Sequence, residues 1–352
     1  MSDAVGIGIL GAGMVARYHQ QAAAACADLG ARLVAVGHPD RARSDAILAA
    51  FGAPRLDPAE LLAHPDVDIV CICTPSGNHA AEAIAAARAG KHVLVEKPMA
   101  LTLADADAMI AAANQAGVRL GVVLQRRTEP VFQRLRAAIT AGELGRLTLG
   151  VVTMPYYRPQ SYYDQAGWRG TWAADGGGVL MNQGIHLIDL LVWLMGDPVA
   201  VQAEAATLRR SIEVEDTLTA TLRFASGAMA VVAATTTAEP GFPHRIELYG
   251  DGGGVQIEGE QITRWHSRQQ QIDMSGGAPA AAGAGGDPRG IGPAGHISIM
   301  RDFIGAVREG RAPAVDGAEG RRSLAAVLAI YEAAGFHHGA AADAESRAGE
   351  GA

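Results

Sequence analysis

Short apolar runs alternate with longer helical segments over the first 124 residues of the chain, and this alternation constrains the fold more than any other feature. The runs are hydrophobic almost throughout, which is typical of strands buried on both faces of a parallel sheet. The intervening segments are long enough to cross over the sheet as helices. We therefore expect a doubly wound α/β domain with strands at residues 5–10, 33–36, 67–73, 92–95 and 118–124 and helices at residues 14–28, 41–51, 78–89 and 103–116.

The pattern changes at about residue 126, where a helix at 129–141 is followed by longer runs that alternate apolar and polar residues. Such alternation is typical of strands with one buried face, and Ser226-Gly227 has the composition of a hairpin turn. We expect an α+β domain with a large, open, mostly antiparallel sheet, one face of which packs on a helix at 185–195. Its strands are predicted at residues 147–154, 199–208, 217–224, 229–236, 245–249, 254–257 and 262–265.

The last third of the chain contains a stretch of biased composition and a polar tail. Residues 275–295 are almost entirely Gly, Ala, Pro and Asp, which predicts a flexible loop with little to bury. Amphipathic helices are expected at 296–308 and 319–334. The sequence thus predicts two domains, residues 1–126 and 127–338, followed by a disordered tail at 339–352.

The composition excludes several classes of protein. The chain of 352 residues carries 29 Lys and Arg against 37 Asp and Glu, a net charge of −8, and it shows no basic stripe for binding nucleic acid. It lacks the run of ~18 uncharged apolar residues that would predict a membrane span, and its first ten residues lack the features of a secretion signal. With only Cys26, Cys71 and Cys73, we expect no disulfide framework and a cytoplasmic location.

A glycine-rich hexapeptide follows the first predicted strand and opens the first helix. It reads GAGMVA at residues 11–16 and matches the G-x-G-x-x-G/A pattern of dinucleotide-binding turns in the required strand–helix context. Gly11 would allow the tight turn and Gly13 the close approach of a pyrophosphate, which the free N–H groups of the helix would bind. Cofactor contacts are therefore predicted at Gly11, Gly13, Met14 and Val15.

The segment after the second strand bears on the choice between NAD and NADP. Dinucleotide-binding turns usually have an acidic residue here, which accepts hydrogen bonds from the adenosine ribose. In this chain His38 occupies that position, and Arg41 and Arg43 follow. Cations without a carboxylate suit a 2′-phosphate, so we expect His38 and Arg43 to contact the cofactor and NADP to be preferred over NAD. The alternative is that Asp40, which we expect to cap the helix, serves as the ribose acceptor.

Lys97 lies between Glu96 and Pro98 directly after the fourth predicted strand. A residue before proline is pushed towards extended geometry, so Lys97 is predicted to end the strand and point into the crevice where such sheets bind ligands. A solvated lysine is the simpler interpretation of any single Lys, but this position favours a function.

A glycine triplet at 176–178 precedes a helix that carries three polar residues within an apolar run. If the helix begins at Asn182, then Asn182, His186 and Asp189 share one face through spacings of four and three residues. An imidazole beside a carboxylate is a candidate for acid–base chemistry, although a lone His on such a helix is more often a core residue. We expect no metal site, because Asn182 is a poor ligand and no third strong ligand is evident.

Together these motifs resemble the Gfo/Idh/MocA family, which contains glucose–fructose oxidoreductase and inositol dehydrogenases. The resemblance runs in order over residues 4–335. It implies an N-terminal Rossmann domain, a C-terminal domain with an open sheet, NAD(P)-linked oxidation or reduction of a sugar or polyol, and a homodimer or homotetramer that pairs the sheets. It rests on the segments GILGAGMVA, CTPSGNHAAEA, GKHVLVEKPMALT, GGGVLMNQGIHLIDLLVWLMG and GRAPAVDGAEGRRSLAAVLAIYEAA.

The resemblance also implies roles for individual residues. Lys97 and His186 match the catalytic lysine and histidine of the family, and Asn182 stands where the family often has Asp. The implied cofactor contacts are Thr74, Pro75, Asn78, His79, Glu96, Lys97, Gln125, Trp168 and Arg169, and the implied substrate contacts are Lys97, Arg126, Trp168, Arg169, Asn182 and His186.

Aromatic residues concentrate in segment 155–172. Tyr and Trp rings combine a flat apolar face with a polar group, which suits the apolar face and hydroxylated rim of a sugar. Tyr156 and Tyr163 are therefore predicted to contact substrate, the alternatives being hydrophobic core or a subunit interface. Arg158 and Arg169 could bind a sugar acid or the phosphate of a nucleotide sugar. The six aromatic residues are Tyr156, Tyr157, Tyr162, Tyr163, Trp168 and Trp172.

For a dehydrogenase, these residues suggest a division of roles. An imidazole suits a general base at neutral pH, so His186 would take the proton of the reacting hydroxyl. Lys97 would stabilise the developing alkoxide, and Asn182 would orient a hydroxyl. Asp189 would either hold the His186 tautomer or pair within the fold. Two other functions stay open, an NAD-dependent glycosidase on the same scaffold and a non-catalytic regulator that senses a dinucleotide.

Overall fold

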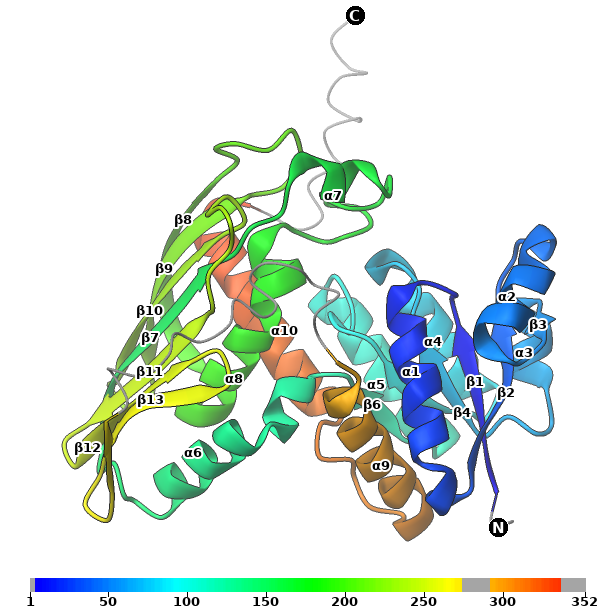
Figure 1. Cartoon of the computed structure of the whole chain (residues 1–352), viewed down its shortest axis with the longest axis horizontal. Coiled ribbons are helices and arrows are strands. Elements are labelled where there is room, and N and C mark those ends of the chain that lie inside the picture. Colours follow the sequence, from blue (N-terminus) through cyan, green and yellow to red (C-terminus); the bar gives the residue numbers. More distant parts are fainter. Residues whose placement is uncertain (1–3, 274–291, 337–352) are drawn as a thin grey trace, which may run out of the picture. The chain divides into compact units, whose positions relative to one another are not determined.

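The computed structural model describes residues 4–273 and 292–336 (Figure 1). They form two compact units, the first from residues 4–129 and 292–321 and the second from residues 130–273 and 322–336. We expected a single C-terminal domain at 127–338, but residues 292–321 return to the first unit. The predicted loop at 275–295 lies outside the described residues as far as residue 291, and so does the predicted tail at 339–352. Within the described ranges, every helix falls short of the length and hydrophobicity of a membrane span.

The first unit is built on a six-stranded parallel sheet of order β3-β2-β1-β4-β5-β6 (Figure 1). Every residue of β1 and β4 is buried, as expected for strands that helices cover on both faces. This confirms the predicted doubly wound fold. The strands are β1 (Val5–Leu10), β2 (Ala31–Gly37), β3 (Arg55–Leu56), β4 (Ile69–Ile72), β5 (His92–Val95) and β6 (Leu120–Val122), and the helices are α1 (Met14–Ala25), α2 (Ser44–Phe51), α3 (Pro58–Ala63), α4 (His79–Arg88), α5 (Leu103–Ala116) and α9 (Ala294–Glu309).

Two short elements of this unit, β3 and α3, were not predicted from the sequence. β3 is only two residues long, so it has no periodicity to detect. Helix α3 does have a local signal, because Pro58 occupies its first turn and Asp57 and Glu60 form a capping box around it. The predicted helix at 14–28 ends early, at Ala25, and continues as a 3₁₀ turn that Gly30 closes in the left-handed conformation.

Helix α9 completes the cover of the first unit although it comes late in the chain. It packs on α1, and Arg301 pairs with Asp28 at 2.7 Å. Phe303 is buried against β6, where a Cβ on Gly121 would lie 2.7 Å from its ring. Only glycine leaves room for this ring on the strand, so the sequence of β6 is matched to a helix about 180 residues later.

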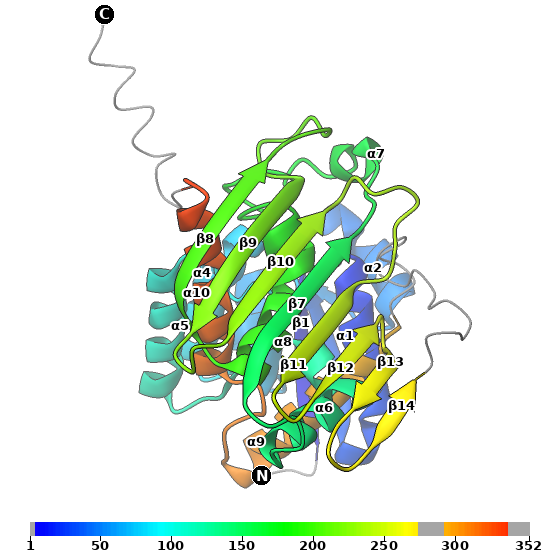
Figure 2. The same ribbon diagram turned by 90° about the vertical axis from the view of Figure 1, so that its left-hand side faces the viewer.

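The second unit contains an eight-stranded sheet of order β14-β13-β12-β11-β7-β10-β9-β8 (Figure 2). Neighbouring strands are antiparallel except for β7 and β10, which are parallel. The predicted open, mostly antiparallel sheet is thus confirmed, and β14 is the strand that was not predicted. The strands are β7 (Leu147–Pro155), β8 (Pro198–Ala206), β9 (Thr217–Phe224), β10 (Met229–Thr235), β11 (Arg245–Gly250), β12 (Gly253–Glu258), β13 (Gln261–His266) and β14 (Gln271–Asp273).

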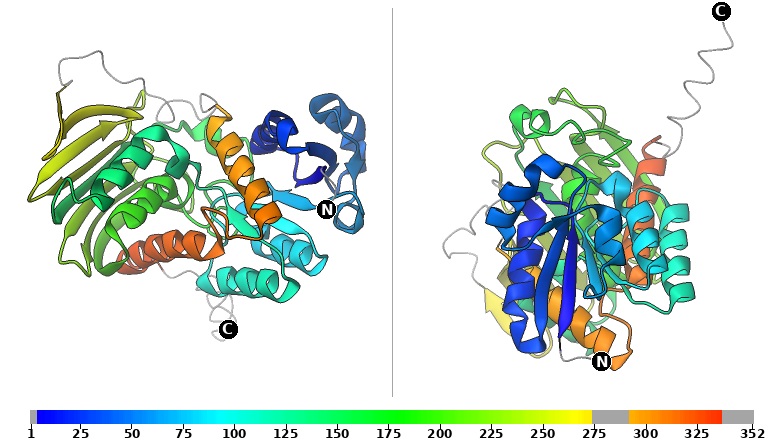
Figure 3. Two further views of the ribbon diagram at one scale, coloured as in Figure 1. Left: turned by 90° about the horizontal axis from the view of Figure 1, so that it is seen from below. Right: turned by 90° about the vertical axis from the view of Figure 1, so that its right-hand side faces the viewer.

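Helices cover one face of this sheet (Figure 3). Alternate residues of β9 are buried, which gives the strand one core face and one exposed face. A Cβ on Gly150 of β7 would lie 2.7 Å from the sulfur of Met195, so α8 packs directly on the strand. The opposite face carries exposed apolar side chains, Leu149, Met229 and Val231. The helices of this unit are α6 (Pro130–Thr140), α7 (Gln160–Asp164), α8 (Ile185–Met195) and, from Arg322 on, α10 (Gly317–Ala333).

The approach to α8 differs from the prediction. The helix itself begins at Ile185, as predicted, but the spacing argument assumed a regular helix from Asn182, and residues Val179–Gly184 instead form a π-helical turn that runs into α8. A π-helical turn is wider than an α-helical turn and often occurs at functional sites. The spacing argument that put Asn182, His186 and Asp189 on one face therefore does not apply across this turn.

Candidate active site

The glycine-rich turn between β1 and α1 is shaped for a phosphate group. Gly11 has a φ of 96°, and a Cβ there would lie 2.7 Å from the carbonyl oxygen of Cys73, so the position requires glycine. A Cβ on Gly13 would meet none of the described atoms within 4 Å, which leaves this backbone open to a ligand. Met14 is exposed and Val15 half-buried, and no acidic residue neutralises the first turn of α1. The turn therefore fits the pyrophosphate of a dinucleotide.

Cations gather at the end of β2, around His38. A guanidinium nitrogen of Arg43 lies 3.1 Å from His38 Nε2, and the Asp40 amide donates to His38 Nδ1 at 3.1 Å. The Asp40 carboxylate accepts a hydrogen bond from the Ala42 amide at 2.9 Å and so caps a short 3₁₀ turn. Asp40 is therefore a cap, as expected. Burial and the Arg43 charge lower the pKa of His38, which favours its neutral form at pH 7.

The loop after β4 is tied down by buried polar groups. Thr74 donates its hydroxyl to Glu82 at 2.5 Å, and burial raises the pKa of this carboxyl. The ring nitrogens of His79 lie 2.9 Å from the Thr74 carbonyl oxygen and 2.7 Å from that of Pro98. The buried His79 ring thus joins two loops instead of facing a cofactor, which corrects the contact that the resemblance implied. The other two residues predicted here are half-buried (Pro75) and exposed (Asn78).

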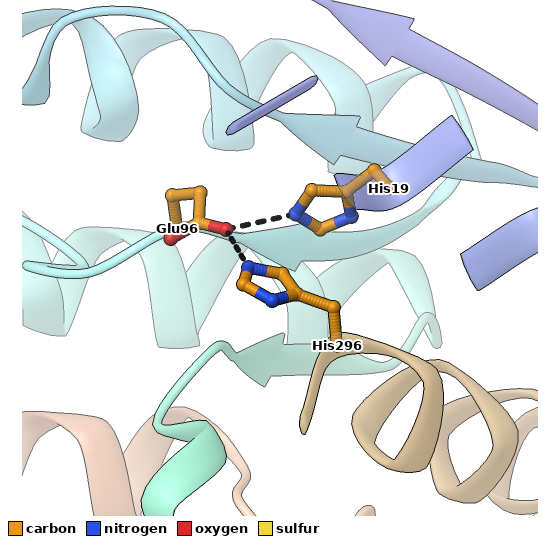
Figure 4. A group of neighbouring side chains, drawn as sticks. All are labelled: His19, Glu96 and His296. Atoms are coloured by element: carbon orange, nitrogen blue, oxygen red, sulfur yellow. Dashed lines mark hydrogen bonds and ion pairs between the residues drawn. The ribbon is translucent and has the colours of Figure 1, made fainter. Parts of the chain in front are cut away.

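Glu96 is the centre of a buried cluster that joins three separate segments (Figure 4). Its Oε1 lies 2.9 Å from Nε2 of His19 on α1 and 3.1 Å from Nε2 of His296 on α9. Its Oε2 accepts a hydrogen bond from the Lys97 amide at 3.3 Å. Burial opposes the charge, but the bonds from His19 and His296 hold the pKa of Glu96 well below its usual range. Glu96 therefore fixes the backbone of Lys97, which corrects its predicted role as a direct cofactor contact.

The three side chains of this cluster are also of the types that bind metal ions. One ligand atom from each of His19, Glu96 and His296 lies within 4.8 Å of the others. A metal-bound imidazole normally donates its second N–H to an acceptor, yet neither His19 Nδ1 nor His296 Nδ1 has a hydrogen-bond partner among the described residues. Two rings that donate from Nε2 to a shared carboxylate fit better, and burial lowers the pKa of His19, which favours the neutral form of that ring. The geometry favours a hydrogen-bonded tie over a metal centre.

Gln125 and Arg126 lie on a 3₁₀ turn, Gln125–Thr128, that follows β6. Arg126 is buried and forms an ion pair with Glu129 at 3.3 Å. Gln125 is half-buried, and its Oε1 has no hydrogen-bond partner within the described part of the chain. The structure thus leaves the Gln125 amide able to bind a ligand, whereas the charge of Arg126 is already paired.

The segment that follows the glycine triplet 176–178 is buried except at three polar residues. Between residues 178 and 192, only Asn182, Gln183 and His186 are not fully buried. Nδ2 of Asn182 donates a hydrogen bond to Asp175 at 2.7 Å, and the other Asp175 oxygen accepts from the Gly170 amide at 3.0 Å. A buried carboxylate therefore stands beside Asn182, although the motif itself has an amide at this position.

Asp189 is fully buried on α8 and accepts a hydrogen bond from Ser323 on α10. Its carboxylate is therefore not exposed to a substrate. Of the two roles considered for Asp189, the structure supports pairing within the fold.

The two tyrosines predicted to contact substrate differ in their surroundings. Tyr156 is buried, and its hydroxyl lies 3.1 Å from Nδ1 of His244, so it is a core residue. Tyr163 donates to the Thr236 hydroxyl at 3.1 Å, and burial raises its pKa to about 12. Unlike Tyr156, it lines a cavity.

Three arginines surround the other tyrosines of this segment, and we call them the arginine cluster: Arg158, Arg169 and Arg210. The Arg169 guanidinium lies 4.3 Å from the centre of the Tyr162 ring, and that of Arg210 lies 5.2 Å from the Tyr157 ring. Within the described residues neither Arg169 nor Arg210 is paired with a carboxylate, and the Nε atom of each lacks a hydrogen-bond partner. Their positive charge is therefore held on aromatic faces and not neutralised.

A cavity of about 400 Å³ opens at the edge of this cluster. Tyr163 and Arg169 line it from one side and Ser211, Ile212 and Glu213 from the loop before β9. Half-buried Trp168 lies next to Arg169, whose guanidinium is 5.4 Å from its ring. Asn182 and His186 are not among the residues that line the cavity.

Several residues of the site were not predicted, and their signals differ. His19 has helical spacing to the buried alanines Ala16, Ala22 and Ala23 of α1, and Asp175 directly precedes the glycine triplet, so both could have been noticed locally. His296 lies 200 residues from Glu96 in the sequence, and no local pattern connects the two. Arg210 is likewise remote from the aromatic segment that it contacts.

The chain was compared with known proteins. Residues 5–124 match the oxidoreductase family with an NAD-binding Rossmann fold, and residues 132–256 match the C-terminal domain of GFO/IDH/MocA proteins. The chain belongs to the Gfo/Idh/MocA oxidoreductase family. The resemblance noted in the sequence is thereby confirmed.

The proteins that are similar to the chain include a curated enzyme and solved structures with bound ligands. Inositol 2-dehydrogenase from Rhizobium meliloti (strain 1021) is 32% identical over 73% of this chain and 76% of its own length. The WlbA dehydrogenase from Bordetella pertussis, in complex with NADH and UDP-GlcNAcA, is 35% identical with a TM-score of 0.83 and coverage of 94% of this chain and 96% of its own. The WlbA structure from Chromobacterium violaceum, with the same ligands, is 36% identical with a TM-score of 0.84 and coverage of 95% of this chain and 94% of its own.

We expect Glu96→Ala to lower the free energy of unfolding by about 3 kcal/mol or more. The change leaves two imidazole N–H groups and the Lys97 amide without their acceptor, at about 1–3 kcal/mol for each buried donor. Because the folded-state pKa of Glu96 is depressed, its stabilisation is present above the unfolded-state pKa and is lost as pH falls through the folded-state value. Urea unfolding at pH 7.5 and at pH 4 measures both effects. Exposed Glu332→Ala serves as the control, and a loss below about 1 kcal/mol would contradict this view of the cluster.

Proposed function

We propose that this protein transfers hydride between NAD(P) and a hydroxyl-bearing carbon of a sugar derivative that carries an anionic group. Family membership and the open turn at Gly13 support the dinucleotide chemistry. Relatives named for inositol and D-apiose support a sugar or polyol. The arginine cluster is the observation that carries the anionic group, and the two similar structures that hold UDP-GlcNAcA, a diphosphate, agree with it.

The chain's own residues manage the proton and the charge of the reaction. When bound, NAD(P) supplies the acceptor or donor of the hydride. The substrate hydroxyl loses its proton as hydride leaves its carbon, and we propose accessible His186 as the base that takes it. Lys97 stabilises the negative charge that develops on the oxygen. Asn182 orients the substrate through its amide, whose own orientation Asp175 fixes.

We expect Lys97→Ala and His186→Ala to fold normally and to lose turnover by about 100-fold or more, the usual effect of a positioned proton-transfer group. Dissociation constants for the cofactor should stay close to those of the wild type. The measurement is NAD(P)H formation at 340 nm on the best substrate from a panel of sugars and polyols. Near-normal kcat in either variant would refute the role of that residue. Release of a free sugar without steady NAD(P)H formation would instead favour the glycosidase alternative.

The anionic group can be tested by comparing matched substrates. A sugar with a carboxylate or phosphate should give a kcat/KM at least about tenfold above its neutral counterpart, because a charge-assisted hydrogen bond contributes about 1.5–3 kcal/mol. Arg169→Gln should remove this preference mainly through KM. Arg88→Gln, at an exposed arginine of α4, is the matched control. Equal use of charged and neutral sugars by the wild type would overturn the proposal for the arginine cluster while leaving the dehydrogenase chemistry intact.

We propose NADP as the preferred cofactor, on the geometry around His38. The Arg43 guanidinium, which can only donate, lies 3.1 Å from Nε2 of His38, and the Asp40 amide donates to Nδ1 of the same ring. An oxygen of a 2′-phosphate would accept from this guanidinium. Relatives named for NAD(+) and for NADP(+) both occur in this family.

His38→Asp should shift the preference towards NAD, since it adds a ribose acceptor and a charge that repels the phosphate. Dissociation constants of the two cofactors, measured for the wild type and the variant, test this. A wild type that prefers NAD tenfold, or about 1.4 kcal/mol, would refute the preference.

We also propose that the protein assembles as a homodimer or homotetramer through the open face of its sheet, where Leu149, Met229 and Val231 are exposed together. We propose a cytoplasmic location, which suits three buried cysteines that are free thiols.

A further inference from the structure

Glu215 is a fully buried carboxylate two residues before β9, and it accepts hydrogen bonds from the segment before α8 and from a tyrosine of α10. Its Oε2 accepts from the Gly178 amide at 2.9 Å, and its Oε1 accepts from the Leu180 amide at 2.9 Å and from the Tyr331 hydroxyl at 2.8 Å. Its carbonyl oxygen accepts from the Val179 amide at 3.1 Å. A single residue thus binds three consecutive backbone amides at the start of the π-helical turn.

Tyr331 on α10 completes this arrangement. Its hydroxyl accepts from the Met181 amide at 3.1 Å and from the Gly178 amide at 3.2 Å, and it is fully buried as well. The first four amides of a helix have no partner within the helix. Here Glu215 and Tyr331 together bind all four, Gly178 to Met181, and we call this arrangement the helix cap.

The glycines before the turn are required by the helix cap. A Cβ on Gly177 would lie 2.2 Å from the Tyr331 hydroxyl oxygen, and a Cβ on Gly178 would lie 1.7 Å from the Glu215 carbonyl oxygen. Gly177 also has a φ of 152°. These positions therefore serve the close approach of two buried side chains to the backbone.

The capped segment leads directly to the residues of the proposed site. Asn182 follows Met181. Its backbone N–H donates to the Gly178 carbonyl oxygen at 3.0 Å, so the backbone of Asn182 is bonded to the first capped residue. His186 follows four residues later and, like Asn182, is only partly buried. We propose that Glu215 and Tyr331 are positioning residues that hold Asn182 and His186 in their reactive placement, and that the ionised form of Glu215 is the competent one. This inference rests on the proposed role of His186.

The chemistry of the cap requires a carboxylate. Each oxygen of Glu215 receives a backbone N–H, so both must be acceptors. A protonated carboxyl or a glutamine amide places a hydrogen on one side, opposite an N–H that it cannot satisfy. The backbone amide of Gly178 or Leu180, within four residues of Asn182, would then lose its hydrogen bond.

The surroundings of Glu215 make its charge sensitive to pH near neutrality. Burial raises the pKa of Glu215 to about 7, against the lowering effect of its hydrogen bonds. Tyr331 is the titratable side chain that contacts it. The neighbouring carboxylates are engaged elsewhere, Asp216 by the amides of residues 208–210 and Asp175 by Gly170 and Asn182. The helix cap is therefore charged above about pH 7 and is lost as the pH falls below it.

The test is the pH dependence of kcat, measured from pH 5.5 to 8.5 at saturating substrate and cofactor. We expect Glu215→Gln to lower kcat about tenfold at pH 8.5 with little change in either KM. At pH 5.5 the wild type has lost the same cap, so the ratio of wild-type to variant kcat should fall towards one. A role in stability alone would give a ratio that does not depend on pH, and such a result would overturn the proposal.

Two further variants make the result specific. Tyr331→Phe keeps Glu215 but removes a hydrogen-bond donor to it. The kcat of this variant should still depend on pH, with the midpoint of its pH profile shifted upwards from that of the wild type. An unshifted midpoint would count against Glu215 and Tyr331 acting together. Asp216→Asn removes the adjacent buried carboxylate, which binds the amides of another loop and whose hydrogen bonds hold its pKa low despite burial. Its kcat ratio should be independent of pH, and a ratio that follows pH as in Glu215→Gln would overturn the assignment to Glu215. If His186→Ala retains activity, the proposed function fails whatever Glu215 does.

Discussion

The buried carboxylate of Glu96 is the interaction on which the first unit depends. It connects α1, which carries the dinucleotide turn, to the end of β5 and to α9. Burying a carboxylate is costly unless hydrogen bonds replace its hydration. Here two imidazoles and a backbone amide replace it, so the three segments must come together for the charge to be tolerated. The placement of Lys97 is a consequence of this requirement.

The second unit uses buried carboxylates in the same way. Asp175, Glu215 and Asp216 each bind backbone amides, and each does so beside a segment with a proposed role. Backbone donors are fixed in direction, so a carboxylate that accepts from them fixes the path of a loop more narrowly than an ion pair of flexible side chains. This explains how a loop-rich region can hold Asn182 in one place.

The sequence predicted the long elements well because their signals are local. The helices Leu103–Ala116 and Ile185–Met195 and the strand Thr217–Phe224 were predicted to the residue. The dinucleotide turn was also predicted from a local motif, and the roles of Lys97 and His186, predicted from local motifs and from the resemblance that they carry, stay predictions. The predictions that failed depended on distant partners. Nothing near His79 announces its two carbonyl partners, and nothing near Glu96 announces His296, because both arrangements are made by the folded chain. The π-helical turn was missed for the same reason, since Glu215 and Tyr331 stabilise it from 35 or more residues away.

The return of α9 to the first unit has a consequence for how the protein is made. Residues 4–129 leave the ribosome long before residue 292, and at about 5–20 residues per second the interval is roughly 10–30 s. During that time α1 lacks the helix that packs on it, the groove beside Gly121 lacks the Phe303 ring, and Glu96 lacks one of its two imidazoles. The nascent dinucleotide unit therefore exposes apolar surface until α9 has been synthesised. A protein arranged in this way depends on chaperones, or on slow collapse of its first unit, more than one whose domains are each continuous in sequence.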